Sequence, residues 1–433
     1  MKRRTGFDLR RASFVLLDNG IRVALAPMPH MASVSLGFWI GVGGRHEPPS
    51  LNGISHFIEH MLFKGTRRRS ARQISEAVEG IGGYLNAFTS EEHTCFYSKA
   101  RHDRFPELLD VLTDMLLHSR FAPDDIETER DVIRDEIAMY LDQPQQHVQE
   151  LLNAVSWPRH PLGRPLTGTK RTVSTLTRRQ LQAYHRQHYV GAATVIAVAG
   201  HFNPQPTLRT IRRLTRGWPT GQPDVFPPVT ARNRGPAVRL ATRRIEQTHL
   251  ALGIRTCSRH DERRFALRLL NVILGENMSS RLFQRIREDA GLAYSIYSSV
   301  SFFADTGDLV ISTGLDTEHL DRVLRLIVAE LRRLVVEMPG RAEFHRARDY
   351  ALGQIDLGLE NTENHMLSVG EQVLGYGRPV SPQTVKRCVA RVQPTDLRAA
   401  ARAFFRPERL SLAIVSPLRR DPGFGRILGR VSS

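Results

Sequence analysis

Cysteines and long apolar runs are scarce in this chain of 433 residues, and each scarcity excludes a class of protein. The three cysteines, Cys95, Cys257 and Cys388, are odd in number and far apart, so they form neither a disulfide framework nor a Cys-x-x-Cys metal site. No apolar run approaches the roughly 20 residues that a membrane-spanning helix needs. Any metal site must therefore use histidines and carboxylates, and no membrane association is predicted.

Lysine is also rare, since only five of the 61 basic residues are lysine. The net charge of +17 favours nucleic-acid binding at first sight, because basic surfaces bind phosphate. The arginines are dispersed, however, and the clusters at 67–69 and 212–213 lack interleaved aromatic residues for base stacking. A solvated arginine-rich surface is the better interpretation, and no nucleic-acid partner is predicted.

The N-terminus resembles the start of a secretory signal only in its charge. Met1 to Arg4 is basic, but no apolar segment follows it. We therefore expect a cytoplasmic protein.

The segment from His56 to His60 carries the most informative motif, H-x-x-E-H, which is a known zinc peptidase signature. On a helix, two histidines four residues apart lie on one face, about a turn apart, and can share a divalent cation. Glu59 shares this face. The apolar side chains of the segment point the other way, toward a core: Phe57, Ile58, Met61 and Leu62.

The two halves of the chain repeat the same order of predicted elements. Each half has a strand (34–40; 250–255), a helix (56–64; 265–274), a β-rich stretch (83–90; 291–298), two long helices (103–118 and 124–142; 317–337 and 341–358) and a last strand (194–199; 410–415). Proline and glycine are frequent over roughly 203–236, as in interdomain linkers. We predict an α+β protein with domains at 1–215 and 237–433, a linker at 216–236, and in each domain a mainly antiparallel sheet packed against helices.

A third metal ligand is needed, because catalytic zinc usually has three protein ligands and one open position. Glu129 and Glu136 lie seven residues apart, two helical turns, so both can point at the same neighbouring helix. The second half lacks the H-x-x-E-H motif and has Gln354 where the first half has Glu136. The second half is therefore expected to have another role, such as substrate capture.

These motifs resemble the M16 peptidases, the pitrilysin and insulinase family, and most closely their processing-peptidase branch. The resemblance extends from 17–23 through 53–66, 129–136 and 160–163 to 280–295. It implies the LuxS/MPP-like metallohydrolase fold, with one Zn²⁺ per chain bound by His56, His60 and Glu136, which lies 76 residues beyond His60. It also implies that Glu129 orients a ligand histidine, although a solvent-facing carboxylate is an almost equal alternative.

The resemblance further implies that the second domain completes the active site with an arginine and a tyrosine seven residues apart. Arg287 and Tyr294 have this spacing. Their structural alternatives are a surface salt bridge for Arg287 and a half-buried sheet residue for Tyr294. Homodimers are also implied, and they are the commonest oligomers in any case.

The predicted function is zinc-dependent hydrolysis of peptide bonds in short or unfolded peptides. Glu59 would act as general base, and Arg287 and Tyr294 would stabilise the oxyanion or hold the substrate. An extended peptide substrate could pair with the strand at Asn86 and Ala87, although Asn86 also suits a turn or strand end. The competing function is that of a non-catalytic M16-like partner or assembly subunit.

Overall fold

The computed structural model describes residues 13–230 and 235–431, which form two compact units. The first unit contains the described residues up to Ile137, with Pro165–Pro227 and Asp356–Pro382. The second contains Ala138–Arg164, the described residues from Pro228 to Ile355, and those from Gln383 onward. The basic start of the chain, Met1 to Arg4, and part of the predicted linker lie outside the described residues.

The first unit is built on a six-stranded sheet with the order β1-β2-β6-β3-β5-β4. Only β2 and β6 pair in parallel, and every other neighbouring pair is antiparallel. Its strands are β1 (Ser13–Leu16), β2 (Arg22–Pro27), β3 (Ser33–Ile40), β4 (Tyr84–Thr89), β5 (Thr94–Arg101) and β6 (Thr194–Gly200). The helices that lie wholly in this unit are α1 (Ile54–Leu62), α2 (Ala71–Glu79), α3 (Phe105–His118), α6 (Lys170–Thr175), α7 (Arg178–His188), α8 (Pro204–Leu214) and α12 (Thr362–Tyr376).

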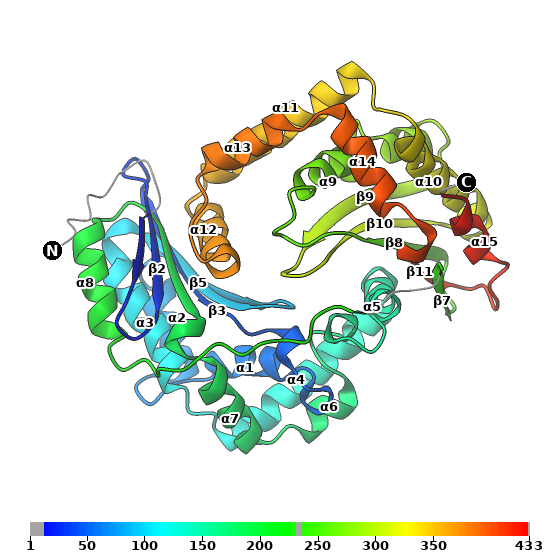
Figure 1. Cartoon of the computed structure of the whole chain (residues 1–433). Helices are drawn as coiled ribbons and strands as arrows, with labels where there is room; N and C mark the ends of the chain where they lie inside the picture. Colours follow the sequence, from blue (N-terminus) through cyan, green and yellow to red (C-terminus); the bar gives the residue numbers. More distant parts are fainter. Residues whose placement is uncertain (1–12, 231–234, 432–433) are drawn as a thin grey trace. The chain divides into compact units, whose positions relative to one another are not determined.

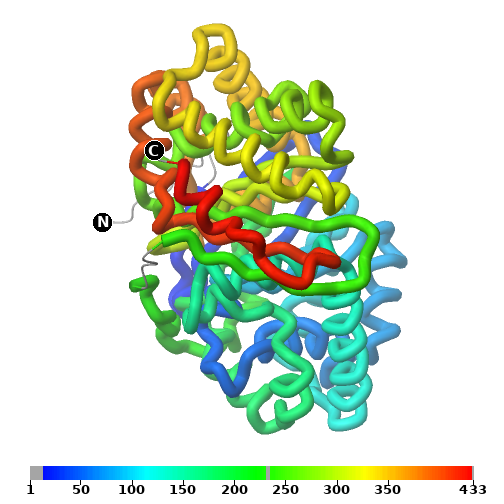
Figure 2. The backbone as a smooth tube through the Cα atoms, turned by 90° about the vertical axis from the view of Figure 1, so that its right-hand side faces the viewer, coloured from blue at the N-terminus to red at the C-terminus, as the bar shows by residue number. Residues whose placement is uncertain are grey.

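The second unit repeats this design on a five-stranded sheet with the order β7-β11-β8-β10-β9. β11 pairs in parallel with β7 and antiparallel with β8, and Figure 2 shows these segments side by side in red and green. The strands are β7 (Ala237–Thr242), β8 (Gln247–Arg255), β9 (Ala293–Phe302), β10 (Gly307–Asp316) and β11 (Leu410–Ser416). The helices that lie wholly in this unit are α5 (Pro144–Ser156), α9 (Arg264–Asn271), α10 (Leu320–Val336), α14 (Pro394–Phe404) and α15 (Phe424–Leu428).

Three helices run across a boundary between the units: α4 (Pro123–Asp142), α11 (Arg341–Leu359) and α13 (Pro382–Arg391). The predicted α+β fold with two similar, mainly antiparallel domains is confirmed. The structure adds that the two sheets share a strand order, since β2-β6-β3-β5-β4 of the first corresponds to β7-β11-β8-β10-β9 of the second. Among residues 13–230 and 235–431, no helix is long and apolar enough to cross a membrane.

Each sheet is covered on one face by a helix from the other half of the sequence. α12 packs on β2, β3 and β6, and α5 packs on β8 and β11 (Figure 1). Small residues allow this close approach: Gly370 of α12 lies against the Trp39 ring, and Leu152 of α5 lies against Gly253. The compact units therefore differ from the halves of the sequence by these two exchanged segments, while the boundaries predicted from the repeat stay a prediction.

The proline-rich stretch after β6 contains a helix as well as a linker. α8 begins at Pro204, and both Pro204 and Pro206 lie in its first turn, where a missing N–H breaks no helical hydrogen bond. Leu208 and Ile211 bury its apolar face. The proline-rich stretch therefore starts within a helix and does not by itself mark where a linker begins, because prolines at the start of a helix resemble those of a linker.

Candidate metal centre

The predicted motif lies on α1, a helix of nine residues that is buried on one side. Its apolar face is almost fully inaccessible to solvent, with Phe57, Ile58, Met61 and Leu62 each at most 1% exposed. α1 lies against β4 and α7. The opposite face presents His56, Glu59 and His60, which are partly accessible, so the helix holds three polar groups beside solvent on a rigid support.

Glu47 holds the N-terminus of this helix. The residue before α1 is Gly53, which has a φ of 94° and no side chain to cap the helix. Instead, the carboxylate of Glu47 accepts hydrogen bonds from the N–H groups of Gly53 (2.7 Å) and Ser55 (2.9 Å) and from the side chain of Asn52 (3.0 Å). Burial raises the pKa of the Glu47 carboxyl, while these N–H groups act in the opposite direction. The helix dipole also stabilises a negatively charged carboxylate at the helix N-terminus.

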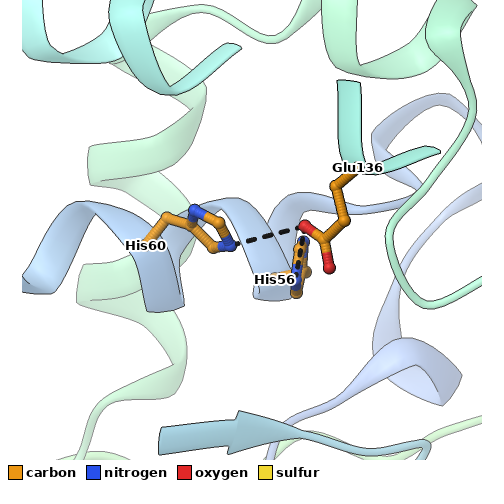
Figure 3. A group of neighbouring side chains, drawn as sticks. All are labelled: His56, His60 and Glu136. Atoms are coloured by element: carbon orange, nitrogen blue, oxygen red, sulfur yellow. Dashed lines mark ion pairs between the residues drawn. The ribbon is translucent and has the colours of Figure 1, made fainter. Parts of the chain in front are cut away.

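His56, His60 and Glu136 come together at one point, with one ligand atom from each lying within 4.8 Å of the others. Figure 3 shows the two imidazoles of α1 and the carboxylate of α4 turned toward a common space. Glu136 Oε2 lies 3.6 Å from His56 Nε2 and 3.7 Å from His60 Nε2. These distances are too long for hydrogen bonds.

The spacing fits a shared metal ion. Two ligand atoms that are each about 2.0–2.1 Å from a tetrahedral zinc ion lie roughly 3.4 Å apart. The electrostatics agree, because burial and then the neighbouring His60 lower the pKa of His56 to about 3. A neutral imidazole keeps a nitrogen lone pair for a metal, so two histidines and one carboxylate form a suitable donor set.

Glu129 lies behind His60. Its Oε2 is 2.9 Å from Nδ1 of His60 and its Oε1 is 2.6 Å from Nζ of Lys64. Burial opposes ionisation of Glu129, but the contacts with His60 and Lys64 outweigh it, and the pKa of this carboxyl is lowered. The Glu129 side chain is only 3% exposed, which excludes the alternative of a solvent-facing helix carboxylate.

Glu59 accepts a hydrogen bond at Oε2 from the hydroxyl of Thr89, the last residue of β4. Burial raises the pKa of the Glu59 carboxyl, Thr89 and His60 lower it, and Glu136 raises it further. Glu59 is therefore a carboxylate with increased proton affinity next to the candidate ligands.

Asn86 and Ala87 lie in β4, which is the edge strand of its sheet. Ala87 N–H donates to Oδ1 of Asn86 at 2.8 Å. A peptide that pairs with this edge through Ala87 must therefore displace the Asn86 side chain.

Arg287 and Tyr294 lie in the second unit and contact each other, with the guanidinium carbon 5.2 Å from the centre of the tyrosine ring. Both occupy irregular backbone. Arg287 is in a π-helical turn (Phe283–Glu288), and Tyr294 has no partner in β10 because the register shifts there. Such π-turns and β-bulges are frequent at functional sites. Tyr294 is 81% exposed, so the alternative of a half-buried sheet residue does not describe it. Arg287 does form the surface salt bridge of its alternative, since its Nε lies 3.5 Å from Oε1 of Glu288.

Three polar residues of this region were not found from the sequence: Glu47, Lys64 and Thr89. Only Lys64 had a local signal, because it follows His60 by four residues and so continues the same helix face. Glu47 and Thr89 reach α1 through a turn and a neighbouring strand, and no spacing rule predicts such contacts.

Two family models match this chain, one after the other along the sequence. The family model described as "Insulinase (Peptidase family M16)" matches residues 22–170, and the one described as "Peptidase M16 inactive domain" matches residues 175–350. An uncharacterized zinc protease of Mycobacterium tuberculosis is 38% identical over 407 residues, 93% of this chain and 92% of that protein. The uncharacterized zinc protease YmxG of Bacillus subtilis is 36% identical over 412 residues, 94% of this chain and 98% of that protein.

Solved structures share the fold at lower identity. A protease from Helicobacter pylori has a TM-score of 0.88 at 20% identity and covers 94% of this chain and 100% of its own. A peptidase M16 inactive domain from Pseudomonas fluorescens has a TM-score of 0.87 at 17% identity, covering 94% of this chain and 98% of its own.

Proposed function

Because this chain belongs to the M16 peptidase family, we propose that it is a zinc-dependent endopeptidase that hydrolyses short or unfolded peptides. The observation that carries the proposal is the cluster of His56, His60 and Glu136 beside the carboxylate of Glu59. The names of the relatives, which are called zinc proteases, support zinc as the metal.

In this proposal His56, His60 and Glu136 hold one zinc ion per chain, with Glu129 orienting His60. Bound zinc supplies Lewis acidity, which polarises a carbonyl group and acidifies water. Thr89 holds the Glu59 carboxylate through a hydrogen bond to Oε2, and we assign to this carboxylate the transfer of a proton from the attacking water to the leaving amine.

The proposal assigns substrate binding to two further places. The edge of β4 at Asn86 and Ala87 pairs with an extended peptide backbone, as exposed edges do elsewhere. Arg287 and Tyr294 stabilise the negative charge on the substrate carbonyl or hold the peptide backbone, a role that follows from the family resemblance.

Metal analysis and peptide cleavage test the proposal together. The purified wild type should contain one zinc ion per chain and cleave an unstructured peptide library. Glu59→Gln should keep the zinc and lose about 10²–10⁴-fold in kcat, since general acid–base catalysis contributes on that scale. Glu79→Gln, an exposed carboxylate on α2, is the matched control and should cleave like wild type.

The proposal fails if the wild type holds no stoichiometric zinc and cuts no peptide, or if Glu59→Gln cuts as well as wild type. A folded wild type without zinc and without cleavage would support the alternative of a non-catalytic M16-like partner subunit. A location in the cytoplasm and a homodimeric state remain predictions.

A further inference from the structure

We propose that Lys64 is a positioning residue of the metal site: its ammonium group binds one oxygen of Glu129 and so keeps the other oxygen on Nδ1 of His60. This inference rests on the proposed function, because the purpose of a fixed His60 is to present Nε2 to a metal. It concerns a residue that lies outside the H-x-x-E-H motif and is not itself a candidate ligand.

The contacts form a chain from solvent to the metal ligand. Lys64 is 35% exposed and approaches Oε1 of Glu129 at 2.6 Å, whereas Glu129 is 3% exposed and meets His60 through Oε2 at 2.9 Å. Lys64 lies two residues beyond the end of α1, and its N–H donates to the carbonyl of Met61 at 3.1 Å. The lysine stem is therefore anchored next to the helix whose histidine it influences.

A carboxylate needs both contacts to keep one orientation. Each oxygen of Glu129 accepts from a different group, so rotation of the carboxylate would break two charge-assisted hydrogen bonds. Without Lys64, Oε1 loses its cationic partner, and a buried carboxylate with one free oxygen turns toward any available donor or water. The bond to His60 then loses its fixed direction.

The choice of lysine supports this role. The chain uses arginine at almost all of its 61 basic positions and lysine at only five, yet it has lysine here. An arginine fork usually binds both oxygens of a carboxylate, which would compete with His60 for Oε2. A lysine ammonium is a compact charge that can satisfy one oxygen and leave the other free.

The consequence for His60 is a defined tautomer. When Nδ1 carries the proton and donates it to Glu129, Nε2 keeps its lone pair, and Nε2 is the atom that lies 3.7 Å from Glu136. Lys64 therefore acts on the metal site through the protonation pattern of one imidazole.

The first measurement uses the metal-free full-length chain. Nitrogen NMR at a single pH, high enough that histidine side chains are neutral, reports the tautomer of His60. The resonances of His60 are assigned by their absence from the spectrum of His60→Gln. We expect the Nδ1–H form to dominate in wild type and to fall at least twofold relative to the other tautomer in Lys64→Met. Lys64→Gln, a second neutral variant, should give the same result and replaces Lys64→Met if that variant folds poorly. The control is Lys170→Met, which changes an exposed lysine of the same unit and should match wild type.

The second measurement is zinc affinity by chelator competition. Removal of a group that orients a metal ligand typically lowers affinity about 10–100-fold. We expect Glu129→Gln to lose this much, Lys64→Met to lose about 10-fold, and the double variant to lose no more than Glu129→Gln alone. This non-additivity is the signature of action through Glu129, which a merely structural lysine would not produce.

The proposal is overturned if the His60 tautomer is unchanged in both Lys64 variants, or if the losses in zinc affinity add in the double variant. Failure of the proposed function is separate: a wild type that binds no zinc refutes it, while the tautomer measurement on the metal-free chain still decides the role of Lys64.

Discussion

At the scale of single residues, the candidate metal helix is held by carboxylates from other elements. The Glu47 carboxylate accepts hydrogen bonds from N–H groups at the start of α1, and the Glu129 carboxylate binds Nδ1 of His60 in its last turn. Buried carboxylates are stable only when donors surround them, and α1 supplies these donors. The position of the histidines therefore depends on residues well separated from them in sequence.

Replacement of Glu47 by alanine tests this dependence. The N–H groups of Gly53 and Ser55 would lose their acceptor in a buried environment, which costs about 1–3 kcal/mol per unsatisfied group. We expect a lower midpoint of thermal unfolding and a weaker zinc affinity. Glu79→Ala on the exposed face of α2 is the control. An unfolding midpoint and a zinc affinity equal to those of the control would show that Glu47 does not hold α1.

At the scale of elements, the packing of α12 on the first sheet depends on the absence of a side chain at Gly370. A Cβ built there would lie 2.1 Å from Nε1 of Trp39, a buried ring. Gly358, near the end of α11, has nothing within 4 Å of such an atom. The same substitution should therefore have opposite effects at the two positions.

Gly370→Ala should destabilise the protein by about 1–3 kcal/mol, since overpacking forces the ring or the helix to move. Gly358→Ala should stabilise it by up to about 1 kcal/mol, because alanine favours helix. Urea unfolding followed by circular dichroism measures both. Equal effects would mean that α12 does not pack on Trp39 in solution.

At the scale of the whole molecule, the candidate ligands all belong to one unit. His56, His60 and Glu136 lie in the first unit, so zinc should stabilise the first unit by mass action, by about 2.7 kcal/mol at a free concentration one hundred times Kd. The three tryptophans allow a separate readout, because Trp39 and Trp218 lie in the first unit and Trp157 in the second.

We expect zinc to raise the unfolding midpoint of Trp157→Phe, in which fluorescence reports only the first unit. The Trp39→Phe/Trp218→Phe variant keeps the reporter of the second unit, which should shift less if the units unfold independently. A His56→Ala background should abolish the zinc effect. Zinc that leaves the first-unit midpoint unchanged would contradict the assignment of the ligands.

Much of the fold follows from local pattern. Predicted helices at 103–118, 124–142 and 341–358 correspond to α3, α4 and α11 within about two residues, because long amphipathic helices repeat the same periodicity over several turns. The motif helix ends at Leu62, two residues before the predicted end at Lys64. Helix ends depend on caps and contacts that periodicity does not record.

The sequence by itself determined the repeated α+β design and the motif residues His56, Glu59 and His60, because both depend on spacing along a helix or strand. Only the tertiary structure decided that α12 packs on the first sheet and α5 on the second. The same holds for the contacts of Glu47, Lys64 and Thr89 with the motif helix or with Glu129. The physical reason is that hydrogen bonds and close packing between elements require atoms within a few ångströms, and spacing along the chain does not set distances between elements.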